Sequence, residues 1–572
     1  MKTFFSLLLF CCFVGVANAQ FTHADSLRGG YGNTRNWWDL KHYDLHVTFN
    51  SETKEIHGHN IIQFTPEERM SNRHTPRRVI QLDLQAPMSI DSIRLVSEEW
   101  HMRDTIFYYN ELITKDKIKQ SGNAWFAELP EEWLSSRSSI IVYFHGKPRE
   151  AVKAPWDGGV IWAKDENGKP WITVACQGLG ASVWFPCKDS QIDEPDNGVQ
   201  MHYTCDSKLK CVSNGHFMGS EEHKNGTTTF SWEVKNPINN YNMIPYIGDY
   251  VNIHDHFQGE KGMLEMDYWV LRGHEADAEK QFLDAPRTLE ALEYWFGPYA
   301  FYEDGYKLVH APHLGMEHQS GIAYGNGFQN GYLGTDLSGT GEGLKWDFII
   351  VHESGHEWFG NNITSKDVAD MWIHESFTNY GETLFMDYWY GTDHANKYCV
   401  GIRKNIKNDI PIIGQYGVNS EGSGDMYYKG ANMLHAIRQI TNNDSLFRMM
   451  LRELNAKFYH QTVTTAEIET FMSTYLKLDL KTIFDQYLRT KNPPTIQLKY
   501  GRKKVKYRWV DCVPDFQMPV KTATGQWINP TEKWQKIAFD QERLWLVDQN
   551  FYIKTKSGPP KEMKLGEVNR VK

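Results

Sequence analysis

The feature that most constrains the fold of this chain is the pentapeptide HESGH, from His352 to His356. It lies between the apolar stretches 348–351 and 358–359, which favours a helix over the whole segment. Because side chains four residues apart share one face of a helix, both imidazoles can reach a single metal ion. Glu353 lies beside that pair, where it can take a proton from a water molecule on the metal. The alternative is a helix with two solvent-facing histidines.

A third ligand is predicted in a second apolar segment. Eighteen residues separate His356 from Glu375, which lies within the aromatic run 371–377. A carboxylate is costly to bury in such a helix unless it is paired or binds a metal. Two histidines and one glutamate leave a coordination position open, which is typical of a catalytic zinc site. We therefore predict one zinc ion held by His352, His356 and Glu375. Glu382, two turns beyond Glu375, is either a residue that orients a ligand or an ordinary solvated glutamate.

The periodicity of the sequence predicts three domains after the first 19 residues. Residues 20–255 are rich in short alternating runs, such as 43–49 and its return strand 56–64, and form a β-rich domain. Within residues 256–491 the period changes to 3.6 residues around Glu275, with helical patterns at 346–359, 372–389, 430–441 and 466–488. Residues 492–572 return to alternation and form a small β domain. The predicted fold class is therefore α+β and multidomain.

The first 19 residues have the pattern of a secretory signal peptide. Lys2 provides a positive charge, Phe4 to Val16 form a short apolar run, and Ala17-Asn18-Ala19 is a small-residue cleavage site. We expect a mature chain that begins at Gln20, is secreted or periplasmic, and has no membrane span after signal cleavage. A retained N-terminal anchor is the alternative.

Composition excludes some partners. The chain carries 61 basic and 71 acidic residues, a formal net charge of −10, which argues against nucleic acid as a partner. Its few cysteines do not make a disulfide scaffold. Cys205 and Cys211 flank a predicted turn, and they are either a disulfide or two buried free thiols.

Four motifs in this order resemble the gluzincin aminopeptidases, the family that includes alanyl aminopeptidase. HESGHEWFGNNIT from His352, followed by WIHESFTNYGE, resembles the family's zinc-binding segments. GMEH from Gly315 resembles its exopeptidase motif Gly-Ala-Met-Glu-Asn, and YYKGA from Tyr427 resembles the segment with its catalytic tyrosine. Gln177 precedes the run Pro-Cys-Lys-Asp as the family's amine-binding residue does. The resemblance covers nearly the whole mature chain and implies a thermolysin-like, mainly helical zinc domain.

The resemblance implies a zinc-dependent aminopeptidase that removes N-terminal residues from peptides through zinc-activated water. Glu353 would be the general base, and Tyr427 would stabilise the oxyanion. Tyr428 is the alternative to Tyr427 if the helix begins one residue later. Gln177 and Glu317 would bind the free α-ammonium of the peptide, with Gly315 and Met316 on the adjoining wall of the substrate site.

Some positions differ from the family pattern, and other activities remain open. His318 replaces the final asparagine of the exopeptidase motif, and His374 stands beside a metal ligand where the family usually has asparagine. The chain after Pro494 is short compared with larger members, so we expect a more open cleft that accepts longer peptides. The alternatives are a zinc endopeptidase, an epoxide hydrolase of the same fold, or an inactive peptide-binding module.

Overall fold

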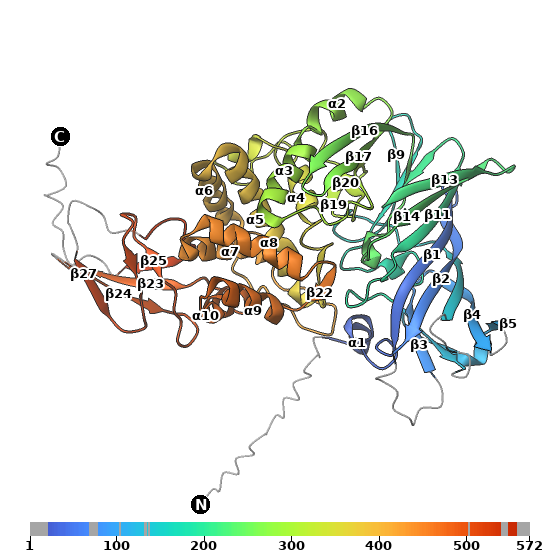
Figure 1. Cartoon of the computed structure of the whole chain (residues 1–572), viewed down its shortest axis with the longest axis horizontal. Helices are drawn as coiled ribbons and strands as arrows, with labels where there is room; N and C mark the ends of the chain where they lie inside the picture. Colours follow the sequence, from blue (N-terminus) through green and yellow to red (C-terminus); the bar gives the residue numbers. More distant parts are fainter. Residues whose placement is uncertain are drawn as a thin grey trace, which may run out of the picture.

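A computed structural model of the chain has a β-rich end, a helical middle and a small sheet at the opposite end (Figure 1). It describes residues 21–67, 78–101, 105–130, 134, 138–501, 504–538 and 547–557. The predicted signal peptide, residues 1–19, lies outside this part of the chain. Within the described residues no helix is both long enough and apolar enough to cross a bilayer.

The β-rich end is built on an eight-stranded sheet. Its strands, in spatial order, are β13 (His216–Glu222), β14 (Thr227–Val234), β11 (Val199–Asp206), β1 (Trp38–Asn50), β2 (Glu55–Pro66), β8 (Ser138–Gly146), β4 (Ser89–His101) and β5 (Thr105–Leu112). The predicted hairpin is confirmed, because β1 and β2 pair antiparallel with Tyr43 opposite Ile62 and Phe49 opposite Ile56. Buried apolar residues of β1 alternate with partly exposed polar ones, so one face of the sheet packs against the core and the other faces outward.

Smaller elements cover the inner face of this sheet. They are the four-stranded sheet β12 (Lys210–Val212), β15 (Tyr246–Gly248), β10 (Pro170–Ala175) and β9 (Gly159–Lys164), and the three-stranded sheet β3 (Arg78–Asp83), β7 (Ala124–Leu129) and β6 (Ile118–Ser121); the short helix α1 (His23–Gly29) has no buried residues and is not one of them. Together they enclose one hydrophobic cluster that contains Trp184, Tyr203 and Ile247. Cys205 and Cys211 are buried as free thiols, so the structure has no disulfide between them.

A five-stranded sheet links the β-rich part to the helices. Its order is β16 (Tyr250–Gly259), β17 (Gly262–Leu271), β18 (Tyr306–His310), β20 (Ile322–Tyr324) and β19 (Gly315–Met316). The predicted boundary at 255/256 therefore lies inside β16, which pairs with β17 over its whole length. The alternating pattern continues past that boundary because β16 and β17 form a hairpin, and the helices of the middle part begin only at Glu275. The three-domain division itself stays a prediction.

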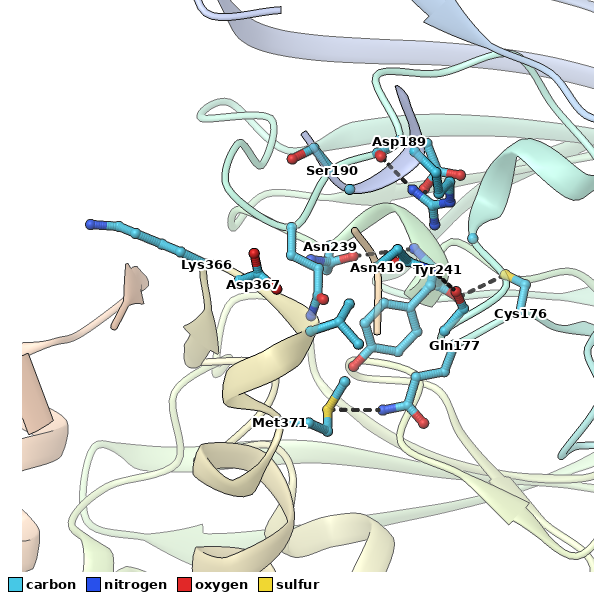
Figure 2. Close-up of a pocket in the computed structure, with 16 residues that line it drawn as sticks. Cys176, Gln177, Asp189, Ser190, Asn239, Tyr241, Lys366, Asp367, Met371 and Asn419 are labelled. Atoms are coloured by element: carbon cyan, nitrogen blue, oxygen red, sulfur yellow. Dashed lines mark hydrogen bonds and ion pairs between the residues drawn. The ribbon is translucent and has the colours of Figure 1, made fainter. Parts of the chain in front are cut away.

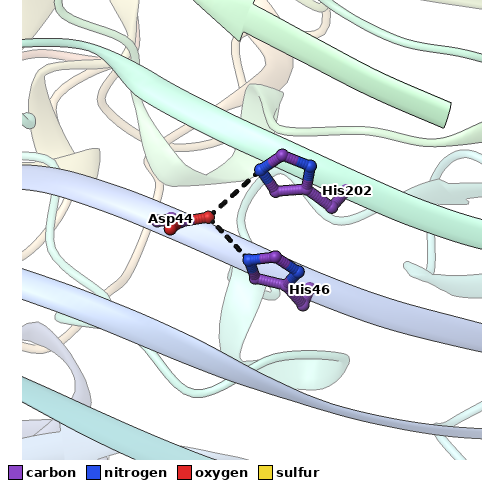
Figure 3. A group of neighbouring side chains, drawn as sticks. All are labelled: Asp44, His46 and His202. Carbon is purple, nitrogen blue, oxygen red and sulfur yellow. Dashed lines mark ion pairs between the residues drawn. The ribbon is translucent and has the colours of Figure 1, made fainter. Parts of the chain in front are cut away.

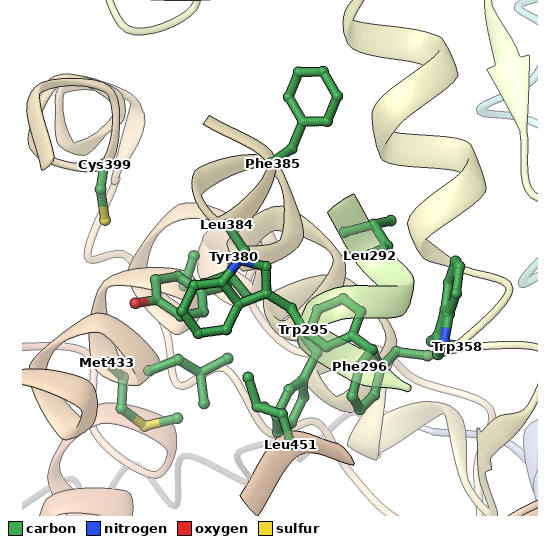
Figure 4. Packing of buried hydrophobic residues seen from close by; sticks show 14 of the residues in the cluster. Leu292, Trp295, Phe296, Trp358, Tyr380, Leu384, Phe385, Cys399, Met433 and Leu451 are labelled. Atoms are coloured by element: carbon green, nitrogen blue, oxygen red, sulfur yellow. The ribbon is translucent and has the colours of Figure 1, made fainter. Parts of the chain in front are cut away.

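The helical middle is packed around α5. Its helices are α2 (Glu275–Gln281), α3 (Asp284–Phe296), α4 (Phe348–Gly355), α5 (Trp372–Tyr390), α6 (Thr392–Gly401), α7 (Tyr428–Thr441), α8 (Asp444–Lys457), α9 (Thr465–Leu476) and α10 (Lys481–Leu488), with the strand pair β21 (Ile363–Ser365) and β22 (Gln461–Val463) beside them. Every residue of α5 from Trp372 to Met386 is buried, as expected of a helix enclosed on all sides. Leu292 and Phe296 of α3, Tyr380 and Leu384 of α5, and Leu451 of α8 lie together in this core (Figure 4).

The helical pattern predicted for 466–488 forms two helices instead of one. Helix α9 ends where Lys477 takes a left-handed backbone conformation, with φ of 54°, and α10 begins at Lys481. The predicted C-terminal β region is present as a four-stranded sheet and a strand pair. These comprise β27 (Gln535–Ala538), β24 (Lys504–Val510), β23 (Thr495–Tyr500) and β28 (Lys554–Ser557), then β25 (Val520–Lys521) and β26 (Trp527–Ile528). Their apolar residues join the hydrophobic cluster of the helices.

Candidate active site

Helix α4 holds the two predicted histidine ligands on one face. Asp347 caps its start, because the carboxylate accepts hydrogen bonds from the backbone N–H groups of Ile349 and Ile350 at 3.0 and 3.3 Å. The helix is shorter than predicted and ends at Gly355, but His356 follows with helical backbone angles. The imidazoles of His352 and His356 therefore stay on the same side, with ring centroids 5.0 Å apart.

Glu375 on α5 completes the predicted ligand set. Its Oε2 lies 3.7 Å from Nε2 of His352 and 3.4 Å from Nε2 of His356. All three residues are buried, and one ligand atom from each lies within 4.8 Å of the others. Burial favours the neutral form of Glu375, but the nearby imidazoles of His356 and His352 hold its pKa well below the usual range.

The donor atoms of these three residues are of the kind that binds a zinc ion. Oε2 of Glu375 is buried and has no hydrogen-bond partner among the described residues. A buried carboxylate oxygen without a donor is costly, and a cation beside it removes that cost. Two imidazole nitrogens and one carboxylate oxygen that converge are the donor set of a catalytic zinc site with a coordination position left open.

Neighbouring groups fix the orientation of both imidazoles. Nδ1 of His352 donates to Oε1 of Glu382 at 2.7 Å, and Nδ1 of His356 donates to the carbonyl of Phe359 at 2.9 Å. Because each Nδ1 carries the proton, each Nε2 is left as the electron-pair donor that a metal needs. Glu382 is itself held by Tyr398, whose hydroxyl donates to its other oxygen at 2.5 Å. Of the two alternatives that the sequence left open for Glu382, this buried contact with His352 fits a residue that orients a ligand better than a solvated glutamate.

Glu353 faces the cleft beside the ligands. A carboxylate oxygen of Glu353, one of Glu317 and a nitrogen of His356 all lie within 4.8 Å of one another. Burial raises the pKa of Glu353 to about 7, although the charges of His352 and His356 oppose this. A carboxyl group with a pKa near neutrality can both accept and return a proton.

Glu317 is a second buried carboxylate of the cleft. It follows β19 in the chain and so comes from a different segment than the helix that carries the histidines. Its Oε1 accepts hydrogen bonds from Nε2 of Gln177 at 2.5 Å and from the hydroxyl of Tyr241 at 2.9 Å. Burial raises the pKa of Glu317. The close-up in Figure 2 shows Gln177, Tyr241 and Met371 converging from three different segments, with the Gln177 amide also in contact with the sulfur of Met371. Tyr241 carries no motif in the sequence, which is why sequence reasoning missed it.

Gly315 and Met316 form β19 at the edge of the five-stranded sheet and line the same cleft. A Cβ atom at Gly315 would lie 2.7 Å from Oε1 of Glu353, so a side chain there would displace the carboxylate. The cleft has a volume of about 370 Å³. Its lining includes the predicted residues Gln177, Gly315, Met316, Glu317, His352, Glu353, His356, Glu375 and Tyr427, together with Glu421 and Tyr428. Glu421 was not predicted, because it stands outside any motif.

The two tyrosines of the YYKGA segment occupy different surroundings. Helix α7 begins at Tyr428, and Tyr427 is the residue immediately before it. The ring of Tyr427 stacks on the imidazole of His352 at 6.0 Å. Burial raises the pKa of Tyr427, and the nearby charges of Glu375 and Glu317 raise it further. The charges that act on Tyr428 are instead those of Glu382 and Tyr332. Tyr427 is thus the tyrosine nearer to the acidic groups of the cleft.

Two histidines that differ from the family pattern have structural partners. His318 is fully buried, and its Nδ1 lies 2.5 Å from the hydroxyl of Tyr246. It is not among the residues that line the cleft. His374 accepts a hydrogen bond from the backbone N–H of Ser365 at 2.8 Å, which ties α5 to β21. Burial lowers the pKa of His374 to about 3, so it is neutral.

Comparison with known proteins agrees with this geometry. Residues 314–487 match the model of the Peptidase family M1 domain. The chain is 22% identical over 386 residues to leukotriene A-4 hydrolase of Xenopus laevis, covering 61% of this chain and 58% of that protein. It is also 22% identical over 405 residues to aminopeptidase B of Mus musculus, covering 64% and 59%. The chain therefore spans less than two thirds of the length of these relatives.

Solved structures show the same fold. An M1 zinc metallopeptidase variant of Deinococcus radiodurans, bound to a Tyr-Ser-Ala substrate, superposes with a TM-score of 0.65 at 18% identity, covering 81% of this chain and 96% of that one. A two-domain M1 zinc metallopeptidase bound to L-tryptophan gives a TM-score of 0.63 at 19% identity, covering 81% and 97%.

The fold and the convergent ligand set are those expected of a gluzincin-type zinc metallopeptidase with a single catalytic zinc. The residues that match the Peptidase family M1 domain, 314–487, include His352, His356 and Glu375, so the similarity to M1 zinc metallopeptidases covers the whole ligand set.

Proposed function

We propose that this protein is a zinc aminopeptidase that removes residues from peptides with a free N-terminus. The observation that carries the proposal is the position of Glu317, whose carboxylate lies within 4.8 Å of ligand atoms of Glu353 and His356. A peptide that enters with its first residue against Glu317 has its first peptide bond at the metal ligands. An ammonium group matches a buried carboxylate in charge, and an internal peptide bond has no such group to offer.

The chain's own residues would divide the reaction among them. When bound by His352, His356 and Glu375, zinc supplies a Lewis acid that polarises a carbonyl and lowers the pKa of water. Glu353 takes the proton from the attacking water and returns it to the leaving amine. The pKa of about 7 for Glu353 suits both steps near neutral pH.

Tyr427 would stabilise the negative charge that develops on the carbonyl oxygen. Its contact with the His352 ring supports a hydroxyl directed at the metal side of the cleft. Loss of one such donor costs roughly 3–4 kcal/mol in other hydrolases. Tyr428 is the second candidate, and the different charges around it make it the weaker one.

The ammonium would be held by Glu317, with Gln177 and Glu375 beside it. Gln177 and Tyr241 both donate to Oε1 of Glu317, so the carboxylate is held in place before the substrate arrives. A carboxylate that is already oriented loses less entropy on binding. Gly315 and Met316 would lie along the first residues of the peptide, because they border Glu353 in the cleft.

Hydrolysis of aminoacyl-anilides beside their N-acetylated counterparts tests this proposal. We expect the purified mature chain to cleave only the free-amine set, to lose activity with a zinc chelator and to regain it with zinc. Glu353→Gln should abolish turnover while the chain keeps its zinc. Glu317→Gln should raise KM for the free-amine substrates.

Each alternative predicts a different result in the same assay. Equal cleavage of the acetylated substrates would favour an endopeptidase. Hydrolysis of an epoxide without peptide cleavage would favour the epoxide hydrolase. No turnover of any substrate by the zinc-loaded chain would favour the peptide-binding module.

We also propose that the protein is secreted or periplasmic. The charge of Lys2, the apolar run from Phe4 to Val16 and the site Ala17-Asn18-Ala19 support export. N-terminal sequencing of the protein from its native source should give Gln20 as the first residue. A chain that still begins at Met1 would contradict cleavage.

A further inference from the structure

The outer face of the eight-stranded sheet carries a row of imidazoles across three adjacent strands. His46 of β1 pairs with His202 of the parallel strand β11 on one side and with His59 of β2 on the other. The rings of His46 and His202 stack at 4.2 Å, and those of His46 and His59 at 4.4 Å. Asp44 lies two residues before His46, so its side chain projects from the same face.

The carboxylate of Asp44 brings two of these imidazoles to one point. Its Oδ1 lies 2.9 Å from Nε2 of His46 and 3.3 Å from Nε2 of His202 (Figure 3). In the part of the chain that the structure describes, groups of three or more metal-ligating side chains with ligand atoms within 4.8 Å occur in the active-site cleft and at Asp44, His46 and His202. This cluster belongs to the β-rich end, whereas the active site lies among the helices.

The cluster is open to solvent on one side and supported on the other. The side chains of His46, Asp44 and His202 are 37%, 25% and 22% exposed. Nδ1 of His202 lies 2.8 Å from the hydroxyl oxygen of Ser231 on β14, the residue that pairs with His202 across the sheet. This contact turns Nε2 of His202 toward Asp44, as outer hydrogen bonds orient histidine ligands in metal sites.

We propose that Asp44, His46 and His202 form a second metal site, which binds a divalent transition ion such as Zn²⁺ or Cu²⁺ on the outer face of the N-terminal sheet. Two imidazoles and one carboxylate are ligands that suit these ions, and the exposed side leaves coordination positions for water. The bound ion would join β1 to β11, two strands that are far apart in the sequence. The site is independent of the proposed peptidase activity.

Metal content per chain tests the proposal directly. The mature chain, loaded with its catalytic zinc, would be dialysed against micromolar Zn²⁺ and its zinc measured by mass spectrometry. We expect two zinc ions per chain in the wild type and one in His46→Ala and in Asp44→Asn. His57→Ala is the matched control, because His57 is an exposed residue of the same strand as His59 but is outside the cluster. It should keep two.

A spectroscopic readout keeps the test valid if an alanine variant folds poorly. Cu²⁺ added to the zinc-loaded protein should give an electron paramagnetic resonance signal with coupling to two imidazole nitrogens. His46→Gln and His202→Gln, which preserve side-chain bulk, should each remove that coupling while peptidase activity stays unchanged. One zinc ion in the wild type, or two in every variant, would overturn the proposal, and the cluster would then be an ion-paired group of histidines only.

Discussion

Oε1 of Glu382 lies 2.7 Å from Nδ1 of His352, and Glu382 stands two turns beyond the proposed ligand Glu375 on the same buried helix. Asn379 donates to the same oxygen at 2.8 Å, and Tyr398 donates to the other oxygen. One helix thus provides both a metal ligand and the group that orients another ligand. Rotation of α5 would disturb both contacts together, so the packing of this helix controls the geometry of the metal site.

Replacing Glu382 should weaken zinc binding. In Glu382→Gln the amide can no longer hold the His352 imidazole as a carboxylate does, and loss of such a contact typically costs 10–100-fold in metal affinity. Competition with a chromogenic chelator would measure the affinity. Tyr398→Phe serves as the graded control, since it removes only one hydrogen bond from Glu382 and should lose less. Unchanged affinity in both variants would mean that His352 is oriented by its packing alone.

The two neighbouring tyrosines should differ in their effect on turnover. Tyr427→Phe removes the proposed oxyanion donor, so we expect kcat to fall about 10²–10³-fold with little change in KM. Tyr428→Phe is the matched control and should stay within a few-fold of the wild type. Steady-state kinetics on a single aminoacyl-anilide would compare them. The reverse order would transfer the oxyanion role to Tyr428.

Glu421 should influence which N-terminal residue is preferred. It lines the cleft, and its Oε1 would be 3.3 Å from a Cβ atom at Gly178, the residue next to Gln177. The side chain of the first substrate residue leaves the same carbon as the ammonium, so a basic side chain can reach this carboxylate. Glu421→Gln should lower kcat/KM for arginyl and lysyl substrates about tenfold relative to leucyl ones, as expected for a hydrogen bond to a charged group. An equal loss for all three substrates would assign Glu421 to the ammonium instead.

Asp347 should make stability depend on pH. Burial raises its pKa from 3.8 to about 6, although hydrogen bonds from Tyr324 and Gln281 oppose this. Between these values the folded chain binds the proton more tightly than the unfolded chain. The free energy of unfolding therefore falls as pH rises from about 4 to about 6, by about 3 kcal/mol for this group.

Asp347→Asn removes this titration from the folded chain. Thermal unfolding of both proteins from pH 4 to 7 would show it as a change in the difference between their Tm values. The Tm of the wild type should fall relative to that of the variant as pH rises through this range. Above about pH 7 the difference between the two Tm values should stay constant. A constant difference in Tm across the range would mean that Asp347 is ionised throughout.

The parts of the site that depend on local spacing could be predicted from the amino-acid sequence. His352 and His356 are four residues apart in an apolar helix, so any fold that kept the helix would bring their nitrogens together. The alternation of residues 43–49 and 56–64 likewise determined a hairpin, because strand periodicity assigns each residue to a face. The order of motifs was enough to indicate the similarity to M1 zinc metallopeptidases and a single zinc ion.

Contacts between residues far apart in the sequence could be known only from the folded structure. Tyr241 contacts Glu317 across 76 positions of the sequence, and His202 faces His46 across a parallel strand pair with no local turn to indicate it. No spacing in the sequence predicts either contact, because the pairing of parallel strands and the placement of loops depend on how whole sheets pack. The pairing of β16 with β17, which spans the predicted boundary at 255/256, depends on packing in the same way. Periodicity defines each element, but hydrophobic burial in three dimensions decides which elements meet.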